Sequence, residues 1–179
     1  MIILGLGSNV GNRLQNLAKA VSVIRKTVLA ATEISPIYES NALLKSGSPS
    51  EWDLPYLNMA IVGETHLSPL ELLKEVKMIE KTLGRQDVGT WAPREIDIDI
   101  LAYECLVVNE ENLVIPHQEL CKRAFALLPL ADVAPNWQYP AEGAFKGKTA
   151  YAIAQEMFVE GPAVAVKTDL QLTEEPLVA

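Results

Sequence analysis

Residues 95–101 read Glu-Ile-Asp-Ile-Asp-Ile-Leu, and this alternation of apolar and acidic residues is the most informative pattern in the chain. Side chains of a β-strand point alternately to opposite faces of the sheet. The isoleucines are therefore predicted to face packed helices, while Asp97 and Asp99 share the other face. The two residues would lie roughly 6.7 Å apart along the strand. This strand predicts a sheet that is covered by helices on one face and open to loops and a ligand on the other.

The two aspartates indicate a bound cation. At an effective dielectric constant of about 20, the repulsion between their carboxylates is on the order of 2.5 kcal/mol. Aspartate is also a poor strand former. Magnesium is the hard cation that accepts carboxylate oxygens while keeping waters and substrate phosphates as further ligands. Two such ions would neutralise charge in phosphoryl transfer. The alternative interpretation is a solvated strand face that binds nothing.

The rest of the first hundred residues shows the periodicity and capping signals of two helices and three more strands. We expect strands at 2–6, 32–38, 56–62 and 95–104, the second of them broken by Pro36, and helices that begin after Asn12 and at Ser68. Ser68 has the spacing of an N-cap with Glu71 three residues later, and Gly84 stands where the helix would end. The order strand, helix, strand, strand, helix, strand predicts an α+β fold with a ferredoxin-like βαββαβ core and an antiparallel sheet.

The C-terminal part of the sequence is less regular. Residues 107–108 and 113–115 flank a polar turn and predict a hairpin. After Pro116 we expect short helical pieces interrupted by Pro129 and Pro135, and a last helix near 149–158. Residues 1–160 are predicted to form a single domain, and residues 161–179 an extended, loose tail.

Composition limits the classes of partner. The chain has 179 residues and a formal net charge of −8, so its surface would repel nucleic acid. No window reaches the ~18–20 apolar residues of a membrane span, and the N-terminus lacks the pattern of a signal peptide. Cys105 and Cys121 are predicted to be two buried thiols, with a disulfide as the alternative. These features favour a soluble, cytoplasmic protein.

Positively charged or chargeable residues flank the acidic strand. Arg85 and Arg94 precede it, and His117 and Arg123 follow the hairpin. Guanidinium groups suit phosphate oxygens, so these residues are candidates for binding a polyanionic ligand. Because residues 94 and 97 are separated by an odd number of positions, the alternation of a strand would place Arg94 on the opposite face from Asp97. Alternatively, the arginines only form ion pairs with the aspartates, Arg85 only places a charge at a helix C-terminus, and His117 is a surface residue.

The strand at 56–62 carries a second candidate site. Tyr56 and Asn58 share one face, with apolar residues on the other. Asparagine is depleted in strands, so its amide here suggests recognition of the donor and acceptor edge of a flat heterocycle. Tyr56 would offer a stacking surface.

Three glycines near the N-terminus resemble a dinucleotide-binding loop. Gly5, Gly7 and Gly11 have the spacing GxGxxxG, whereas that loop requires GxGxxG followed by further βαβ units. We interpret them as turn residues between a strand and a helix. A nicotinamide-binding enzyme built on this loop is the corresponding alternative function.

Together these segments resemble the 6-hydroxymethyl-7,8-dihydropterin pyrophosphokinase family. The matching pieces occur in family order between residues 2 and 137. They are 4–13 with Leu17, 35–40, 55–60, 79–80 with 83–85, 91–101, and 115–117 with Arg123 and Phe125. The segment 91–101 is the most specific of them.

The resemblance implies a ferredoxin-like monomer that uses ATP and two magnesium ions. The pterin hydroxyl would attack the β-phosphorus of ATP, AMP would leave, and a pterin diphosphate would form in folate synthesis. The residues assigned by the resemblance are Asp97 and Asp99 for the metal ions, Arg85, Arg94, His117 and Arg123 for the phosphates, Trp91 for closure over ATP, and Asn58, Tyr56 and Phe125 for the pterin. Catalysis is assigned to Arg85, Arg94, Asp97 and Asp99.

The sequence also departs from the family pattern. Thr90 stands where a basic residue usually precedes the tryptophan, and residues 86–89 lack a further Arg or Lys. These departures put the rate in doubt more than the reaction. A non-catalytic ferredoxin-like module that binds a small ligand is the alternative function, and it would not need paired aspartates beside arginines.

Overall fold

The computed structural model describes residues 1–86, 92–158 and 165–172. Its elements are β1 (Ile2–Ser8), α1 (Arg13–Thr27), β2 (Ala30–Ile34), β3 (Tyr38–Ser40), β4 (Tyr56–Glu64), α2 (Pro69–Thr82), β5 (Asp97–Tyr103), β6 (Val108–Glu110), β7 (Leu113–Ile115), α3 (Ala124–Val133), α4 (Ala150–Phe158) and β8 (Ala165–Lys167), with short 3₁₀ helices at Ser50–Trp52 and Leu120–Lys122. Within these ranges one antiparallel sheet has the order β5-β1-β4-β3-β8, with β2 also paired to β4. Strands β6 and β7 form the predicted hairpin.

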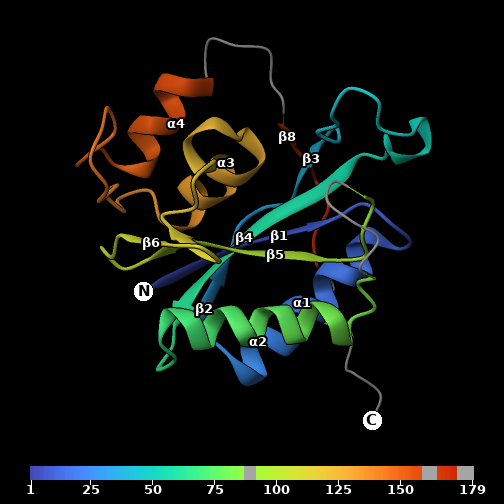
Figure 1. Cartoon of the computed structure of the whole chain (residues 1–179), viewed down its shortest axis with the longest axis horizontal. Helices are drawn as coiled ribbons and strands as arrows, with labels where there is room; N and C mark the ends of the chain where they lie inside the picture. Colours follow the sequence, from blue (N-terminus) through green and yellow to red (C-terminus); the bar gives the residue numbers. More distant parts are fainter. Residues whose placement is uncertain (87–91, 159–164, 173–179) are drawn as a thin grey trace.

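The predicted ferredoxin-like core is confirmed. Strands β5, β1 and β4 lie side by side, and β2 and β3 together take the place of the second strand of the βαββαβ unit. Helices α1 and α2 cover one face of the sheet, while α3 and α4 lie on the other (Figure 1). The second face is therefore less open than the sequence suggested, because two helices cover part of it.

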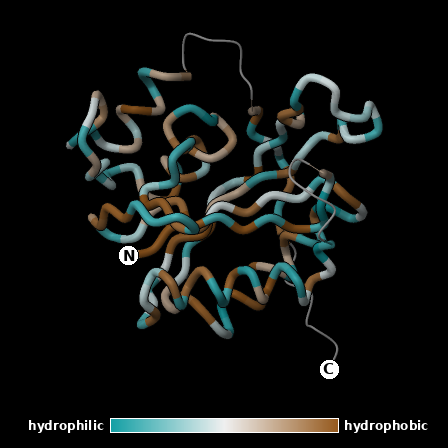
Figure 2. The backbone as a smooth tube through the Cα atoms, in the orientation of Figure 1, coloured by the Kyte–Doolittle hydropathy of each residue, from teal (hydrophilic) through white to brown (hydrophobic). Residues whose placement is uncertain are grey.

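Each face of the sheet has its own hydrophobic cluster. The isoleucines at 96, 98 and 100 pack with α1 and α2, as the alternation in β5 predicts. On the other face Leu101, Leu127 and Ile153 join β5 to α3 and α4. Figure 2 shows α2 as alternating hydrophobic and hydrophilic stretches, the pattern of a helix with one buried side.

The predicted strand at 32–38 is broken at Pro36, as the sequence indicates, and forms β2 and β3. Proline has no backbone N–H, so the hydrogen-bond ladder cannot continue through Pro36. The Ser35 hydroxyl accepts a hydrogen bond of 2.9 Å from the N–H of Ala60 at the break. Strand β2 ends before this point, and β3 starts two residues after the proline.

Two further expectations about local structure are wrong. Pro129 does not interrupt a helix, because α3 runs through it with Leu127, Pro129 and Leu130 all buried. Burial of this apolar helix offsets the lost N–H of the proline. Gly5 and Gly7 are not turn residues but lie within β1. Of these three N-terminal glycines, only Gly11 has the positive φ, 66°, of a turn glycine.

Part of the predicted tail is also ordered in the fold. Strand β8 pairs with β3, and the N–H of Thr168 donates a 2.8 Å hydrogen bond to the carbonyl of Ile37. The sequence has no strong strand signal here, so this edge strand was not anticipated. A domain boundary near residue 160 stays a prediction.

Two features bear on the environment of the chain. Both cysteines are free, but only Cys121 is buried, so the prediction that Cys105 is buried is wrong. Burial raises the pKa of the Cys121 thiol to about 11. None of the helices in the described ranges has the length and apolar character that a membrane-spanning helix requires.

Helix α2 begins with the predicted capping box. The Ser68 hydroxyl accepts from the N–H of Glu71, and the Glu71 carboxylate accepts from the N–H of Ser68. We expect Ser68→Ala to lower the free energy of unfolding by about 1 kcal/mol, because the N–H of Glu71 loses the hydroxyl that accepts its hydrogen bond. Urea denaturation measures this change. Ser46→Ala, in an exposed loop, is the matched control, and equal loss in both variants would contradict the prediction.

Candidate active site

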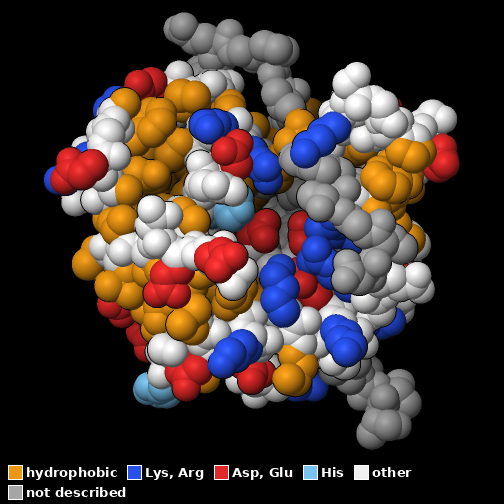
Figure 3. Space-filling view, in the orientation of Figure 1, with side chains coloured by type: hydrophobic (Ala, Val, Ile, Leu, Met, Phe, Trp, Pro, Cys, Tyr) orange, Lys and Arg blue, Asp and Glu red, His pale blue; other side chains and the backbone are white. Residues whose placement is uncertain are grey.

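A pocket of about 300 Å³ opens on the face of the sheet opposite α1 and α2. Its walls come from β1, β4, β5, the segment after β3 and the start of α3. Figure 3 shows acidic side chains in this hollow with Lys, Arg and His around them. The predicted site residues that line it are Tyr56, Asn58, Arg85, Arg94, Asp97, Asp99, His117, Arg123 and Phe125. Trp91 lies outside the described residues.

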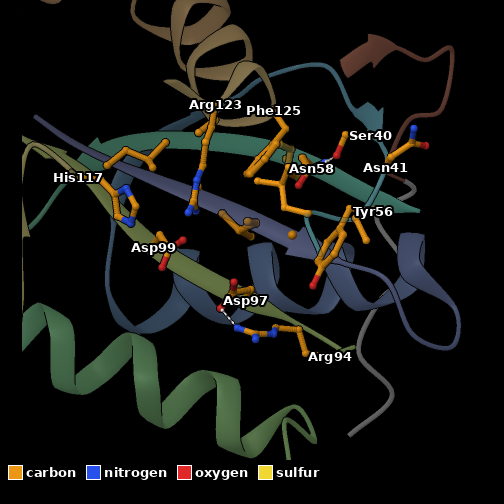
Figure 4. A pocket seen from close by; sticks show the side chains of 18 of the residues that line it. Ser40, Asn41, Tyr56, Asn58, Arg94, Asp97, Asp99, His117, Arg123 and Phe125 are labelled. Atoms are coloured by element: carbon orange, nitrogen blue, oxygen red, sulfur yellow. Dashed lines mark hydrogen bonds and ion pairs between the residues drawn. The ribbon is translucent and has the colours of Figure 1, made fainter. Parts of the chain in front are cut away.

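The two aspartates project from β5 into the pocket, as the strand parity predicts (Figure 4). In the register with β1, Asp97 lies opposite Gly7 and Asp99 opposite Gly5. A β-carbon on Gly5 would come within 3.1 Å of the Leu101 side chain. Glycine at these two positions therefore keeps the pocket face of β1 free of side chains.

Asp97 is bound by two arginines. Its Oδ1 atom accepts from Arg85 Nη1 at 2.6 Å and from Arg94 Nη1 at 3.2 Å. Burial acts to raise the pKa of Asp97, but the nearby charges of Arg94 and Arg85 outweigh it and the pKa is lowered. Asp97 is therefore an ionised carboxylate at neutral pH.

Asp99 has a different environment. Among the residues that the structure describes, none forms a hydrogen bond or an ion pair with its carboxylate. Burial raises the pKa of Asp99, and the negative charge of Asp97 raises it further. His117, Lys77 and Arg123 only partly counteract these effects. The site thus holds a carboxylate whose charge is not fully compensated by the protein.

The placement of Arg94 corrects the parity argument. Because β5 begins at Asp97, residue 94 precedes the strand and does not follow its alternation. The backbone N–H of Arg94 donates to Asn9 Oδ1 at 2.8 Å, and its Nε donates to the carbonyl of Ala92 at 3.2 Å. These bonds turn the guanidinium toward Asp97, on the pocket side.

A buried glutamate of α2, Glu80, hydrogen-bonds to the backbone of the acidic strand β5. The Glu80 side chain is only 2% exposed and accepts a 2.7 Å hydrogen bond from the N–H of Ile98, between the two aspartates. It also accepts from Lys77 Nζ at 2.9 Å and from Arg85 Nη1. Glu80 therefore joins α2, the edge of β5 and the arginine that binds Asp97.

Sequence reasoning gave no role to Lys77 or Glu80. Glu80 appeared only as part of a family-like segment. A detectable signal was present, because Glu80 follows Val76 by four residues and so continues the apolar stripe of α2 with a charge. Lys77 lies next to that stripe and gives no comparable signal.

His117 and Arg123 close the pocket on the side of the hairpin and α3 (Figure 4). The N–H of Glu119 donates to His117 Nδ1 at 3.2 Å. In the neutral imidazole this arrangement puts the proton on Nε2, which is then a donor. The Arg123 guanidinium lies 5.8 Å from the centre of the Phe125 ring.

The other end of the pocket is uncharged. Asn58 Nδ2 donates a 3.0 Å hydrogen bond to the Ser40 hydroxyl, which fixes the orientation of the buried amide. Tyr56 and Phe125 lie on either side of Asn58 in Figure 4. A β-carbon on Gly7 would lie 3.2 Å from Asn58 Oδ1, so the glycine keeps this end accessible. The arrangement offers two aromatic rings and an amide to a flat polar ligand.

The donor set fits a hard divalent cation. Two carboxylates share one face, and the one with the raised pKa has no hydrogen-bond partner among the described residues. The described residues include no group of three or more His, Cys, Asp or Glu that could hold a metal on its own. A cation here would need ligand oxygens from a substrate or water, which is the usual coordination of magnesium.

Comparisons with known proteins agree on a family. A sequence model of the 7,8-dihydro-6-hydroxymethylpterin-pyrophosphokinase family matches residues 3–135. The chain is 40% identical over 139 residues to 2-amino-4-hydroxy-6-hydroxymethyldihydropteridine pyrophosphokinase of Aquifex aeolicus, covering 78% of this chain and 83% of that protein. It is 44% identical over 151 residues to the folate synthesis bifunctional protein of Chlamydia muridarum, covering 83% of this chain. This chain spans only 34% of the length of that bifunctional protein.

A solved structure supports the fold. The crystal structure of wild-type Plasmodium falciparum HPPK-DHPS superposes with a TM-score of 0.64, at 17% sequence identity. The match covers 87% of this chain and 44% of that one. At this identity the likeness concerns the arrangement of helices and strands.

The uncompensated charge of Asp99 should destabilise the fold in the absence of a divalent cation. The folded pKa lies above the value of about 4 in an unfolded chain, so the folded state binds more protons between these values and stability falls as pH rises. We expect Asp99→Asn to raise the free energy of unfolding by about 1–2 kcal/mol at pH 7 with EDTA, less than the bare repulsion because arginines flank Asp97. The gain should disappear below about pH 4.

Urea denaturation at several pH values measures this difference. Glu111→Gln removes an exposed carboxylate of the hairpin turn and controls for the general benefit of reducing a net charge of −8. A gain in Asp99→Asn no larger than in this control would show that the Asp99 charge is not costly.

Proposed function

The chain belongs to the 7,8-dihydro-6-hydroxymethylpterin-pyrophosphokinase family, and we propose that it transfers pyrophosphate from ATP to 6-hydroxymethyl-7,8-dihydropterin. The hydroxyl oxygen of the pterin forms a bond to the β-phosphorus. The bond between that phosphorus and the oxygen bridging to the α-phosphate breaks. AMP leaves with this oxygen, the hydroxyl proton is released, and the pterin carries the diphosphate. The reaction belongs to folate biosynthesis.

The pair of aspartates surrounded by cations is the observation that supports this proposal best. Asp97 and Asp99 share one pocket with Arg85 and Arg94, and with His117 on the opposite wall. A neutral ligand would not interact strongly with this many positive and negative side chains. A triphosphate with divalent cations would match both sets, because the carboxylates suit the metal and the guanidinium groups suit the phosphate oxygens.

Asp97 and Asp99 would hold two magnesium ions. When bound, magnesium neutralises charge on the phosphate oxygens and so favours attack at phosphorus. Asp97 is already ionised at neutral pH and can bind a cation without losing a proton. The Asp99 carboxylate has no hydrogen-bond partner among the described residues, so its oxygens are available as ligands. Arg85 and Arg94 would then exchange their contact with Asp97 for phosphate oxygens.

The cationic side chains contribute position and charge. Arg85, Arg94 and Arg123 would hold the phosphates, with His117 donating from Nε2. Trp91 is proposed to cover the nucleotide. The chain needs no covalent intermediate with substrate, so its residues act by aligning the hydroxyl with the β-phosphate and by stabilising charge there.

The uncharged end of the pocket would bind the pterin. The flat ring would lie between Tyr56 and Phe125, and the Asn58 amide would bond its polar edge. Ser40 keeps one amide proton of Asn58, which leaves the amide oxygen for the ligand. The two ends of one pocket thus suit the two substrates of the proposed reaction.

We propose a monomer in the cytoplasm. The described side chains assigned to the site all line one pocket of a single chain, which supports a site formed within the monomer. Both cysteines are free thiols, which accords with a reducing compartment. A non-catalytic ligand-binding module is the competing function, and it predicts binding without production of AMP.

Production of AMP tests the proposal directly. Purified chain with magnesium, ATP and 6-hydroxymethyl-7,8-dihydropterin should release AMP in an amount equal to the pterin diphosphate formed. Asp97→Asn and Asp99→Asn should each reduce the rate by about 10³-fold or more, since each removes charge that the transition state requires. Glu111→Gln should keep the wild-type rate. Absence of AMP with the wild-type chain, or full activity in either aspartate variant, would refute the proposal.

The pterin end can be tested separately. We expect Asn58→Ala to raise the KM for the pterin by about 10-fold or more, because a buried polar edge of the ligand loses its partner. The KM for ATP should change less than about twofold. Asn109→Ala, exposed in the hairpin, is the control. An equal rise in both KM values for Asn58→Ala would instead indicate a general disturbance of the pocket.

A further inference from the structure

Lys77 reaches the pocket from the opposite face of the sheet. It lies on α2, yet it is among the residues that line the pocket. Its Nζ atom donates to Glu80 Oε1 at 2.9 Å and to the carbonyl of Ile98 at 3.2 Å. The side chain is 44% exposed, so its ammonium group is held by the protein while remaining open to the pocket.

The open edge of β5 explains how this is possible. β5 is the last strand of the sheet on its side, so backbone groups that point away from β1 have no neighbouring strand. At Ile98 both groups are bound by α2 instead, the N–H by Glu80 and the carbonyl by Lys77. Residues 77 and 80 are three apart and share one side of the helix. The ammonium is thereby fixed beside the residue that separates Asp97 from Asp99.

The number of donors decides what Lys77 can still bind. An ammonium group has three N–H donors. Two are used by Glu80 and Ile98, and within the described part of the chain the third has no acceptor. Because the two bonds already restrict the long side chain, binding a third acceptor costs less conformational entropy than ordering a free lysine would.

We propose that Lys77 is a further nucleotide-binding residue, whose third N–H donates to an anionic oxygen of the bound triphosphate. This inference rests on the proposed function and extends its phosphate site to α2. Arg85 and Arg94 both bind Asp97 before any ligand arrives. Lys77 does not bind either aspartate, so it can receive a phosphate oxygen without first leaving a carboxylate of the pocket.

Three variants separate this role from a structural one. Lys77→Met removes the charge and all donors, Lys77→Gln keeps a donor for the Ile98 carbonyl without the charge, and Lys77→Arg keeps both. Lys81→Met is the control, because Lys81 is an exposed lysine one turn further along α2 and does not line the pocket.

Calorimetric titration with magnesium and a non-hydrolysable ATP analogue measures the nucleotide affinity. We expect both Lys77→Met and Lys77→Gln to bind the analogue about 10-fold more weakly or worse, the usual effect of losing a hydrogen bond to a charged group. Lys77→Arg should stay within about threefold of wild type, and Lys81→Met should be unchanged. The KM for the pterin at saturating ATP and the Tm should change little in Lys77→Gln.

Two results would overturn the inference. One is a wild-type nucleotide affinity in Lys77→Met or Lys77→Gln. The other is a Lys77→Gln variant whose Tm falls and whose affinities for both substrates fall together, since this would assign Lys77 a purely structural role. Wild-type production of AMP is measured first. If the wild-type chain produces no AMP, the proposed function and this inference both fail. If it does produce AMP and one of these two results is obtained for the Lys77 variants, only the inference is rejected.

Discussion

Asp97 and Asp99 place two like charges on one face of the edge strand β5, and the charged residues of the pocket are arranged around this pair. Asp97 and Asp99 repel each other, and burial makes both charges more costly. At Asp97 the negative charge is balanced by ion pairs with Arg85 and Arg94. At Asp99 the negative charge is only partly balanced by the nearby cations. A strand with such a pair is stable only inside a larger charged network, and that network is the pocket.

Helix α2 carries much of this network although it packs on the other face of the sheet. Glu80 is a buried charge, which costs free energy unless it is well paired. Burial raises the pKa of Glu80, and its contacts with Lys77, Arg85 and the N–H of Ile98 offset only part of this cost. The same contacts cover the unpaired edge of β5 and position Arg85. One buried carboxylate thus serves both the fold and the site.

The pocket combines a charged end with an uncharged end, and β1 separates them without filling either. Gly5 lies opposite Asp99, and Gly7 lies between Asp97 on β5 and Asn58 on β4. A side chain at position 5 would press on Leu101, and one at position 7 would press on the Asn58 amide. Ordinary strand formers would stabilise β1 better. Glycine in the middle of this strand is consistent with ligand binding directly over the sheet.

The sequence by itself determined the ferredoxin-like order of elements, the capping of α2 and the common face of Asp97 and Asp99, because these depend on local periodicity and on hydrogen bonds between near neighbours. It also indicated the break at Pro36, but it did not determine the continuous α3 through Pro129, the strand β8 or the direction of Arg94. The role of Lys77 has no signal in the sequence, and that of Glu80 is indicated only by its charge on the apolar stripe of α2. Each of these depends on contacts between segments far apart in the chain, such as Glu80 with Ile98, and only the tertiary structure brings such partners within hydrogen-bond distance.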